Sequence, residues 1–234
     1  MNDTVLELAR VSRSYGRGKR AVHALCEVDV QVPPHSLTAV IGPSGSGKST
    51  FLQCAAGLDR PTSGVVRLGG RVISEMRERS LSRLRRTHIG FVFQSFNLLP
   101  ALTVQQNVLL PLRLDGREDA RPGELSGGQQ QRVAIARALI TGPEVVFADE
   151  PTGSLDQETG TDILNLLREA VDRQGATVVL VTHDPSVTAR ADRVLRLAEG
   201  RLVEDSWAAV DAVSGVRASH VTRAAVAAEK GRIR

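Results

Sequence analysis

Residues 42–50 constrain the fold of this 234-residue chain more than any other part of its sequence. The segment is Gly42-Pro43-Ser44-Gly45-Ser46-Gly47-Lys48-Ser49-Thr50. It fits G-x-x-x-x-G-K-[ST], the phosphate-binding P-loop, between an apolar run at 37–41 and an apolar helical pattern from Phe51. The glycines let successive backbone N–H groups face an anion, while Lys48 can reach the β- and γ-phosphates and the Ser49 hydroxyl suits Mg²⁺. The sequence therefore predicts a site for a nucleoside triphosphate.

Composition excludes several classes of protein. No run of 18 apolar residues is present, so we expect no transmembrane helix. Residues 1–4 lack the basic start and apolar core of a signal peptide, which favours a cytoplasmic location. Cys26 and Cys54 have no Cys or His at metal-ligand spacing, so we expect reduced core cysteines. The net charge of +4 gives no indication of a nucleic-acid partner, and none is predicted.

One stretch of the chain is strongly basic. Its arginines are Arg67, Arg71, Arg77, Arg79, Arg83, Arg85 and Arg86. Only Glu75 and Glu78 oppose them, and no aromatic residue lies among them that could stack on single-stranded nucleic acid. Two interpretations stay open: a solvated helix face, or a surface near phosphates, a partner subunit or an acidic membrane.

The spacing of apolar residues predicts an α/β fold. Short continuous apolar runs are typical of parallel strands covered on both faces, and a period near 3.6 predicts helices. The predicted strands are 5–11, 28–32, 37–41, 64–68, 71–73, 89–93, 145–148, 177–181, 193–198 and 201–203. The predicted helices are 78–86, 103–110, 129–139 and 157–173. Residues 205–234 are rich in Ala and Val with scattered charge, and we expect a weakly ordered or loosely helical tail.

Two carboxylates end a predicted strand downstream of the P-loop. Asp149 and Glu150 directly follow the apolar run 145–148. In P-loop nucleotidases an acid at this place holds Mg²⁺ through water, and the next acid can polarise an attacking water. A strand that simply runs into an acidic turn remains the alternative.

A further motif joins the others in a recognisable order. It is Leu125-Ser126-Gly127-Gly128-Gln129, a Ser-Gly-Gly segment that opens a predicted helix and offers bare N–H groups as a second anion site. Gln94 follows one predicted strand and His183 another. Together with the P-loop and Asp149-Glu150, this order resembles the ATP-binding cassette (ABC) ATPases, over roughly residues 5–203.

The resemblance implies a P-loop NTPase fold with a mainly parallel core sheet and an N-terminal antiparallel β subdomain. It also implies a helical subdomain inserted at about 95–142, within an ATPase domain that spans 1–204. Residues 205–234 would be a C-terminal tail outside that domain.

The resemblance also implies roles for individual residues. Tyr15 matches the aromatic residue that stacks on adenine, although a strand-end tyrosine is the alternative. Residues 42–50 would hold the phosphates of ATP. Ser49 and Gln94 would coordinate Mg²⁺, and Asp149 would do so through a water. Glu150 would be the general base.

Other implied roles concern the transition state and the second protomer. His183 would contact the γ-phosphate. Asp156, in Ser154-Leu155-Asp156, matches the loop that crosses to the partner. The motif at 125–129 would contact the nucleotide held by the other protomer, so that hydrolysis requires a homodimer.

The segments 90–100 and 57–64 resemble one branch of the family, which serves lipoprotein release, macrolide or peptide export, and cell division. This branch implies a separate membrane permease as partner, attachment to the inner face of the plasma membrane through it, and export or mechanical work in preference to import. A soluble cassette ATPase of DNA repair or translation is a rival, but those carry further modules in the same chain.

The sequence departs from the family in one place. Gln94 and Leu125 are only 31 positions apart (94 to 125), fewer than in relatives, and the break lies near Arg117. We therefore expect a shortened helical subdomain that keeps the nucleotide site. An alternative function follows: a nucleotide-binding module that is uncoupled from transport.

Overall fold

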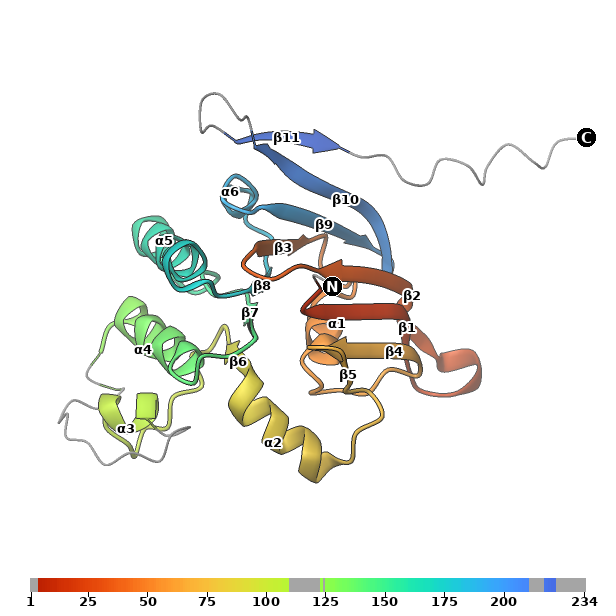
Figure 1. Cartoon of the computed structure of the whole chain (residues 1–234), viewed down its shortest axis with the longest axis horizontal. Helices are drawn as coiled ribbons and strands as arrows, with labels where there is room; N and C mark the ends of the chain where they lie inside the picture. The colour runs from red at the N-terminus through yellow and green to blue at the C-terminus, as the bar shows by residue number, and fades with distance from the viewer. Residues whose placement is uncertain (1–3, 110–122, 124, 211–216, 222–234) are drawn as a thin grey trace, which may run out of the picture.

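Two β-sheets form the framework of the protein in the computed structural model, which describes residues 4–109, 123, 125–210 and 217–221 (Figure 1). One sheet is antiparallel, in the order β2-β1-β4-β5, and the other has seven strands in the order β11-β10-β9-β3-β8-β7-β6. The strands are β1 (Leu6–Tyr15), β2 (Val22–Val32), β3 (Leu37–Ile41), β4 (Ser63–Leu68), β5 (Arg71–Val72), β6 (Ile89–Val92), β7 (Val145–Asp149), β8 (Val178–Val181), β9 (Arg193–Ala198), β10 (Arg201–Val210) and β11 (Arg217–Val221). The helices are α1 (Lys48–Ala55), α2 (Glu78–His88), α3 (Val104–Leu109), α4 (Gly127–Leu139), α5 (Gln157–Gln174) and α6 (Pro185–Thr188), with a 3-10 turn at Gly18–Arg20.

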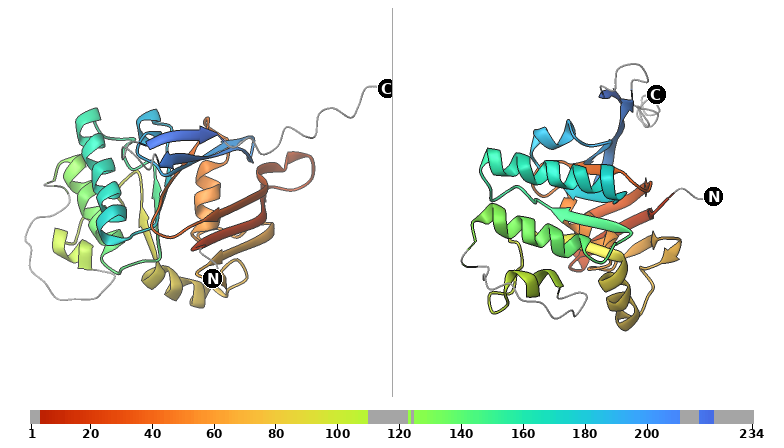
Figure 2. Two further views of the ribbon diagram at one scale, coloured as in Figure 1. Left: turned by 45° about the horizontal axis from the view of Figure 1, so that its top comes forward. Right: turned by 60° about the vertical axis from the view of Figure 1, so that its left-hand side comes forward.

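The centre of the seven-stranded sheet is parallel and buried on both faces. Strands β9, β3, β8, β7 and β6 pair in parallel, and nearly every residue of β3, β7 and β8 is buried. Helix α1 and the antiparallel sheet cover one face, while α4 and α5 cover the other (Figures 1 and 2). The expected α/β class and the continuous apolar runs of its strands are confirmed.

Helix ends follow the local sequence. Asp156 caps α5 by accepting from the Thr159 N–H at 2.9 Å, and Gly175 ends it with a φ of 67°. Ser126 caps α4 in a reciprocal capping box with Gln129. Sequence periodicity predicted the ends of α4 and α5 to within about two residues. The capping residues Ser126 and Asp156 explain where the two helices begin.

The structure differs from the expected C-terminal tail in the residues that it describes there. β10 runs past the expected boundary at 204 to Val210 and pairs antiparallel with β11. Asp205 and Trp207 hold this extension: the buried Arg193 guanidinium donates to the Asp205 carboxylate at 2.6 and 2.7 Å and lies 4.8 Å from the Trp207 ring centroid. Arg193 of the neighbouring strand β9 therefore stabilises the extension of the hairpin. The hydrophobic alternation of the sequence could not predict this contact.

Part of the expected helical subdomain is described. α3 and α4 lie within 95–142 and pack against each other. The expected break near Arg117 lies outside the described residues. None of the described helices combines the length and apolar composition that a membrane span requires. Cys54 is buried, and burial raises the pKa of its thiol to about 12, whereas Cys26 is only half-buried.

Candidate nucleotide site

The P-loop connects β3 to α1 and has a glycine at each end where a side chain would not fit. Gly42 has a φ of 155° and Gly47 a φ of 101°. A Cβ on Gly42 would lie 2.2 Å from the Leu197 carbonyl oxygen, and one on Gly47 would lie 2.3 Å from that of Ala24. Neighbouring backbone therefore approaches the loop at both ends, which fixes its curvature.

The turn between β9 and β10 supports the same loop. The Gly200 N–H donates to the Ser46 carbonyl at 3.0 Å, and the Gly200 carbonyl accepts from the Cys26 N–H of β2 at 2.8 Å. The sequence indicated only a hairpin turn at this place. Its role as a buttress of the phosphate loop was missed, because no local pattern connects residue 200 with residue 46.

Lys48 and Ser46 give the loop its anion-binding character. The Lys48 ammonium group is folded over the loop, where it donates to the carbonyl oxygens of Gly42 at 2.9 Å and Pro43 at 3.0 Å. The Ser46 hydroxyl is buried and has no hydrogen-bond partner among the described residues. A charge and an unpaired hydroxyl over a curled backbone fit a phosphate group.

Asp149 ends β7 beside the first turn of α1. Burial raises the pKa of its carboxyl, as does the charge of Glu150, while a hydrogen bond from the Ser49 hydroxyl opposes the rise. The Oδ1 atom is buried and has no hydrogen-bond partner in the described part of the chain. An unpaired carboxylate oxygen beside a hydroxyl is a donor set that suits Mg²⁺, so these residues fit the expected cation.

Gln94 lies at the same edge of the sheet. β6 and β7 are parallel neighbours, with Val92 opposite Ala148, so the residues that follow them meet at one edge. The exposed Gln94 side chain lies over Gly153, whose Cβ position would be 3.1 Å from its Nε2 atom. The structure therefore brings Gln94 to the Asp149–Glu150 edge, as the sequence predicted.

Glu150 and His183 contact each other directly. Nδ1 of His183 lies 2.9 and 3.0 Å from the two carboxylate oxygens of Glu150. Glu150 has a φ of 46°, and its N–H donates to the Val181 carbonyl at 2.9 Å, which ties it to the end of β8. The Glu150 side chain is 16% exposed and that of His183 71% exposed, so the imidazole is the outer member of the pair. The sequence predicted both residues but not their contact.

The motif at 125–129 lies apart from the P-loop of its own chain. A Cβ on Gly127 would meet Leu155, and one on Gly128 would meet Thr159 Cγ2 at 2.3 Å, so the start of α4 packs on the start of α5. Gln131, fully buried, donates to the Pro151 carbonyl at 2.7 Å and joins α4 to the loop after Glu150. The P-loop instead has β2 and the β9–β10 turn as neighbours, so one chain does not bring these two motifs together.

The last two predicted site residues both have partners. Tyr15, at the end of β1, is 38% exposed, and its hydroxyl donates to the Asp59 carboxylate at 2.8 Å. Asp156 accepts hydrogen bonds from the Thr159 N–H at 2.9 Å and hydroxyl at 2.7 Å, and these bonds lower the pKa of its carboxyl. Its carboxylate is thus a helix cap, and its predicted contact with a second protomer stays a prediction.

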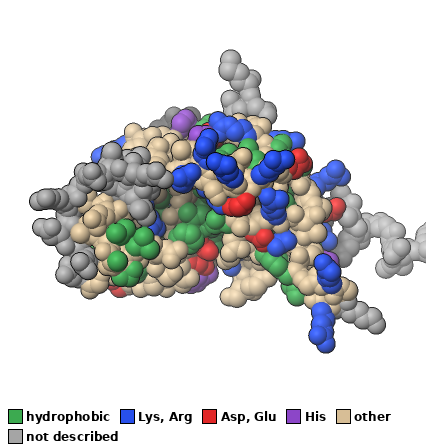
Figure 3. Space-filling view, turned by 90° about the horizontal axis from the view of Figure 1, so that it is seen from below, with side chains coloured by type: hydrophobic (Ala, Val, Ile, Leu, Met, Phe, Trp, Pro, Cys, Tyr) green, Lys and Arg blue, Asp and Glu red, His purple; other side chains and the backbone are tan. Residues whose placement is uncertain are grey.

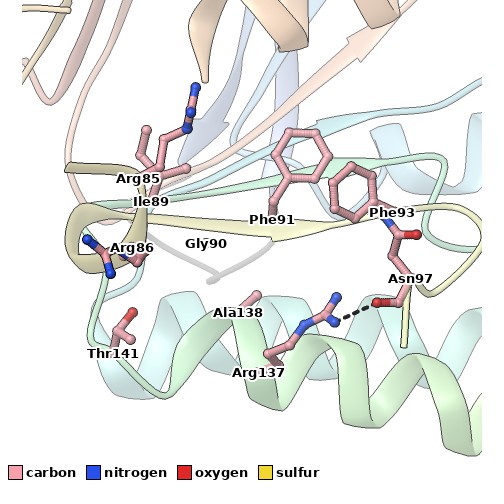
Figure 4. A pocket seen from close by; sticks show the side chains of 10 residues that line it. All are labelled: Arg85, Arg86, Ile89, Gly90, Phe91, Phe93, Asn97, Arg137, Ala138 and Thr141. Atoms are coloured by element: carbon pink, nitrogen blue, oxygen red, sulfur yellow. Dashed lines mark hydrogen bonds between the residues drawn. The ribbon is translucent and has the colours of Figure 1, made fainter. Parts of the chain in front are cut away.

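A groove of about 550 Å³ opens beside the site, between β6 and α4 (Figure 4). Its apolar side chains include Ile89, Phe91 and Phe93, and its rim is cationic. The rim residue Arg137 donates to the carbonyls of Asn97 at 2.7 Å and Phe96 at 3.1 Å, which holds the loop after Gln94. Burial lowers the pKa of Arg137.

Helix α2 borders this groove with arginines, and Lys and Arg side chains gather on the face seen from below (Figure 3). The exposed arginines of this segment are Arg71, Arg77, Arg79, Arg83 and Arg86. Arg85 instead donates to the Gly57 carbonyl at 2.6 Å and pairs with Glu78. The basic stretch is thus mostly a solvated helix face, and only Arg85 and Arg86 of its arginines line the groove.

Comparison with known proteins agrees with this geometry. Residues 25–153 match the family model described as ABC transporter. The chain is 44% identical over 225 residues to the macrolide export ATP-binding/permease protein MacB of Marinobacter nauticus, covering 87% of this chain and 35% of the relative. It is 43% identical over 222 residues to MacB of Salmonella typhimurium, covering 86% and 34%. The chain therefore spans about a third of the length of these relatives.

Solved structures are similar over nearly their whole length. The ATP-binding cassette MJ0796, solved as a dimer in a post-hydrolysis state bound to ADP and Pi, is 37% identical with a TM-score of 0.78, covering 86% of this chain and 97% of that one. The protein cbiO1 from Clostridium perfringens, part of the complex cbiONQ, is 28% identical with a TM-score of 0.77, covering 87% and 88%.

Proposed function

The chain is an ATPase cassette of the ABC transporter family, and on that premise we propose that it drives a separate membrane permease in export or mechanical work. The observation that carries the proposal is the meeting of Lys48, Asp149 and the Glu150–His183 pair at the carboxyl ends of β3, β7 and β8. In open parallel sheets ligands bind at this edge.

Within this site we assign ATP to the P-loop and Tyr15. Residues 42–50 hold the phosphates with backbone N–H groups and the Lys48 charge, and Tyr15 takes the adenine. Glu150 accepts the proton of the attacking water, while His183 holds the Glu150 carboxylate and faces the γ-phosphate. The buried, unpaired Asp149 Oδ1 supports Mg²⁺ as the cofactor, together with Ser49 and Gln94.

We propose that two copies of the chain complete each site. Ser126 caps α4 away from the P-loop of its own chain, and the first two residues of the helix, Gly127 and Gly128, have no side chain to cover their backbone N–H groups. A helix N-terminus of this kind binds anions, so it can close over the nucleotide held by a partner. The dimeric cassette MJ0796 supports the same arrangement.

The groove between β6 and α4 is our candidate for the permease contact. Its apolar lining with a cationic rim suits a short amphipathic segment, and it lies beside the loop that carries Gln94. Binding there would hold the chain at the cytoplasmic face of the plasma membrane. The relatives named MacB contain ATP-binding and permease parts in one protein, which supports this pairing.

The short distance from Gln94 to Leu125 favours the alternative function, a nucleotide-binding module uncoupled from transport. The two functions differ in one measurement, the phosphate release of the purified chain with and without a candidate permease subunit. Export predicts a stable complex and stimulated hydrolysis, with Lys48→Ala inactive in both states. Basal hydrolysis without complex or stimulation, restored by grafting a relative's helix pair between Arg117 and Glu118, would show the uncoupled module.

A further inference from the structure

One carboxylate oxygen holds both the hydroxyl of Tyr15 and the guanidinium of Arg13. Tyr15 donates from its hydroxyl to Asp59 Oδ2 at 2.8 Å, and Arg13 Nε donates to the same oxygen at 2.8 Å. The Arg13 guanidinium carbon also lies 4.5 Å from the Tyr15 ring centroid. Three side chains from two separate segments therefore form one closed network.

The carboxylate is itself fixed by its loop. The other Asp59 oxygen accepts from the Arg60 N–H at 2.8 Å, and the Asp59 N–H donates to the Gln53 carbonyl at 3.1 Å. The loop is tied to β1 by Thr62, whose N–H donates to the Ser12 carbonyl at 2.7 Å and whose hydroxyl accepts from the Ser14 N–H at 3.0 Å. Asp59 therefore has little freedom to move relative to the strand that carries Tyr15.

This network sets which face of the tyrosine is available. The hydroxyl anchors the far edge of the ring, and the guanidinium covers one face. A planar ligand can stack only on the remaining face, and Tyr15 is 38% exposed. The ring is thus held in one orientation before anything binds.

The ring lies close to the phosphate loop along the strands. Tyr15 pairs with Val22 of β2, and the Ala24 carbonyl, two residues on, packs against Gly47. Two residues of strand span about 7 Å. Helix α1 begins with Lys48, and the segment that follows it carries Asp59, so one helix and its loop position both the phosphate site and the ring.

We propose that Arg13 and Asp59 are positioning residues that hold Tyr15 as a preformed platform for the nucleotide base. The inference rests on the assignment of Tyr15 to the adenine in the proposed function. A side chain that is already ordered loses no rotamer freedom when the base stacks on it, which strengthens binding. Without the network, the ring must be ordered by the ligand.

The test compares two ligands that share the phosphates but differ in the base. Mg–AMP-PNP carries adenine, and Mg-tripolyphosphate carries none. Asp59→Asn and Arg13→Gln should each weaken Mg–AMP-PNP about 3- to 10-fold, the range expected for one freed side chain, and leave Mg-tripolyphosphate within about 2-fold. In the ATPase assay KM should rise while kcat is kept.

Glu7→Gln is the matched control. Glu7 also lies on β1 and pairs with an arginine of β4, Arg67, at 3.1 Å, but it is eight residues from Tyr15 along the strand. It should leave both affinities unchanged. Tyr15→Phe, which keeps the ring and removes the hydroxyl, should fall between wild type and Asp59→Asn.

A spectroscopic readout separates positioning from general structural damage. Tyr15 is the only tyrosine of the chain, so 3-fluorotyrosine labelling gives a single fluorine resonance. In Asp59→Asn and Arg13→Gln this resonance should move toward that of the free amino acid, and in Glu7→Gln it should not. Equal losses for both ligands, or losses no larger than in the control, would overturn the inference.

Tyr15→Ala distinguishes failure of the positioning role of Arg13 and Asp59 from failure of the proposed adenine site. If Tyr15→Ala weakens Mg–AMP-PNP while Asp59→Asn and Arg13→Gln do not, only the positioning role is wrong. If Tyr15→Ala leaves Mg–AMP-PNP binding unchanged, the adenine platform is wrong, and the inference is wrong with it.

Discussion

Glu150 and His183 form a hydrogen-bonded pair, with His183 Nδ1 at 2.9 Å from one carboxylate oxygen and 3.0 Å from the other. Both oxygens are acceptors when Glu150 is ionised, so Nδ1 carries the proton of this bond. In the neutral ring Nε2 is then an acceptor, and only the imidazolium donates from both nitrogens. His183 can therefore hold the base in either state, but it donates to a phosphate oxygen only when protonated.

Replacing Glu150 by Gln should separate binding from turnover. Because the amide cannot accept a proton, the turnover number should fall at least 100-fold while the affinity for ATP is kept. His183→Ala should also lower turnover with little effect on affinity, since it releases the Glu150 carboxylate. Phosphate release combined with equilibrium ATP binding measures both quantities. Near-normal turnover in Glu150→Gln would remove Glu150 from the role of base.

The buried carboxylate of Asp149 should lower the stability of the fold, although Mg²⁺-dependent hydrolysis needs it. Burial raises the pKa of its carboxyl above that of the unfolded chain, so the folded state binds this proton more tightly, and folding loses stability as pH rises through the folded pKa. Asp149→Asn removes this cost. Without Mg²⁺ it should unfold at a higher temperature than wild type at pH 8, by a margin that shrinks as the pH is lowered and the wild-type carboxyl is protonated, and it should lose Mg²⁺-dependent hydrolysis.

Asp162→Asn is the control for that experiment. Asp162 is 53% exposed and pairs with Arg132 at the surface, so its replacement should give no such gain. A wild type that stays at least as stable as Asp149→Asn at pH 8 would contradict the assigned cost of the buried charge.

The contact between α4 and α5 should depend on Gly128. A Cβ there would lie 2.3 Å from Thr159 Cγ2, so Gly128→Ala should destabilise the fold by about 1–3 kcal/mol. Thr159→Ser removes Cγ2 but keeps the hydroxyl that donates to Asp156 at 2.7 Å. The double variant should therefore recover most of the loss in a urea unfolding experiment.

Gly127→Ala is the matched control, because its Cβ would lie 3.3 Å from the flexible end of Leu155 and 3.7 Å from the Phe96 ring, with no contact as short as that of Gly128. It should cost clearly less than Gly128→Ala. If Thr159→Ser fails to rescue Gly128→Ala, the clash between these two side chains is not the source of the destabilisation.

Local patterns predicted much of this molecule. The P-loop and the buried strands each depend on residues a few positions apart, so periodicity and motif spacing were enough to place β3, α1 and α5. The convergence of Gln94, Asp149 and His183 was predictable too, because parallel strands bring their carboxyl ends to one edge.

What the sequence missed depends on contacts between distant segments. Gly200 supports Ser46, and Gln131 holds Pro151, through single hydrogen bonds to backbone carbonyls. The extension of β10 likewise depends on Arg193. The periodicity of the sequence cannot predict such a pair, because neither partner stands out by residue type or spacing within its own segment.

The most direct test of the account is the mass of the Glu150→Gln chain in solution with Mg-ATP, measured by light scattering on a sizing column. The nucleotide should hold two chains together without being consumed, so the mass should double from the 25.1 kDa of one chain. Lys48→Ala should stay at 25.1 kDa because it binds ATP weakly, and Ser126→Ala should stay there although it binds ATP. A Glu150→Gln chain saturated with Mg-ATP that remains at the mass of one chain would contradict a site shared between two protomers.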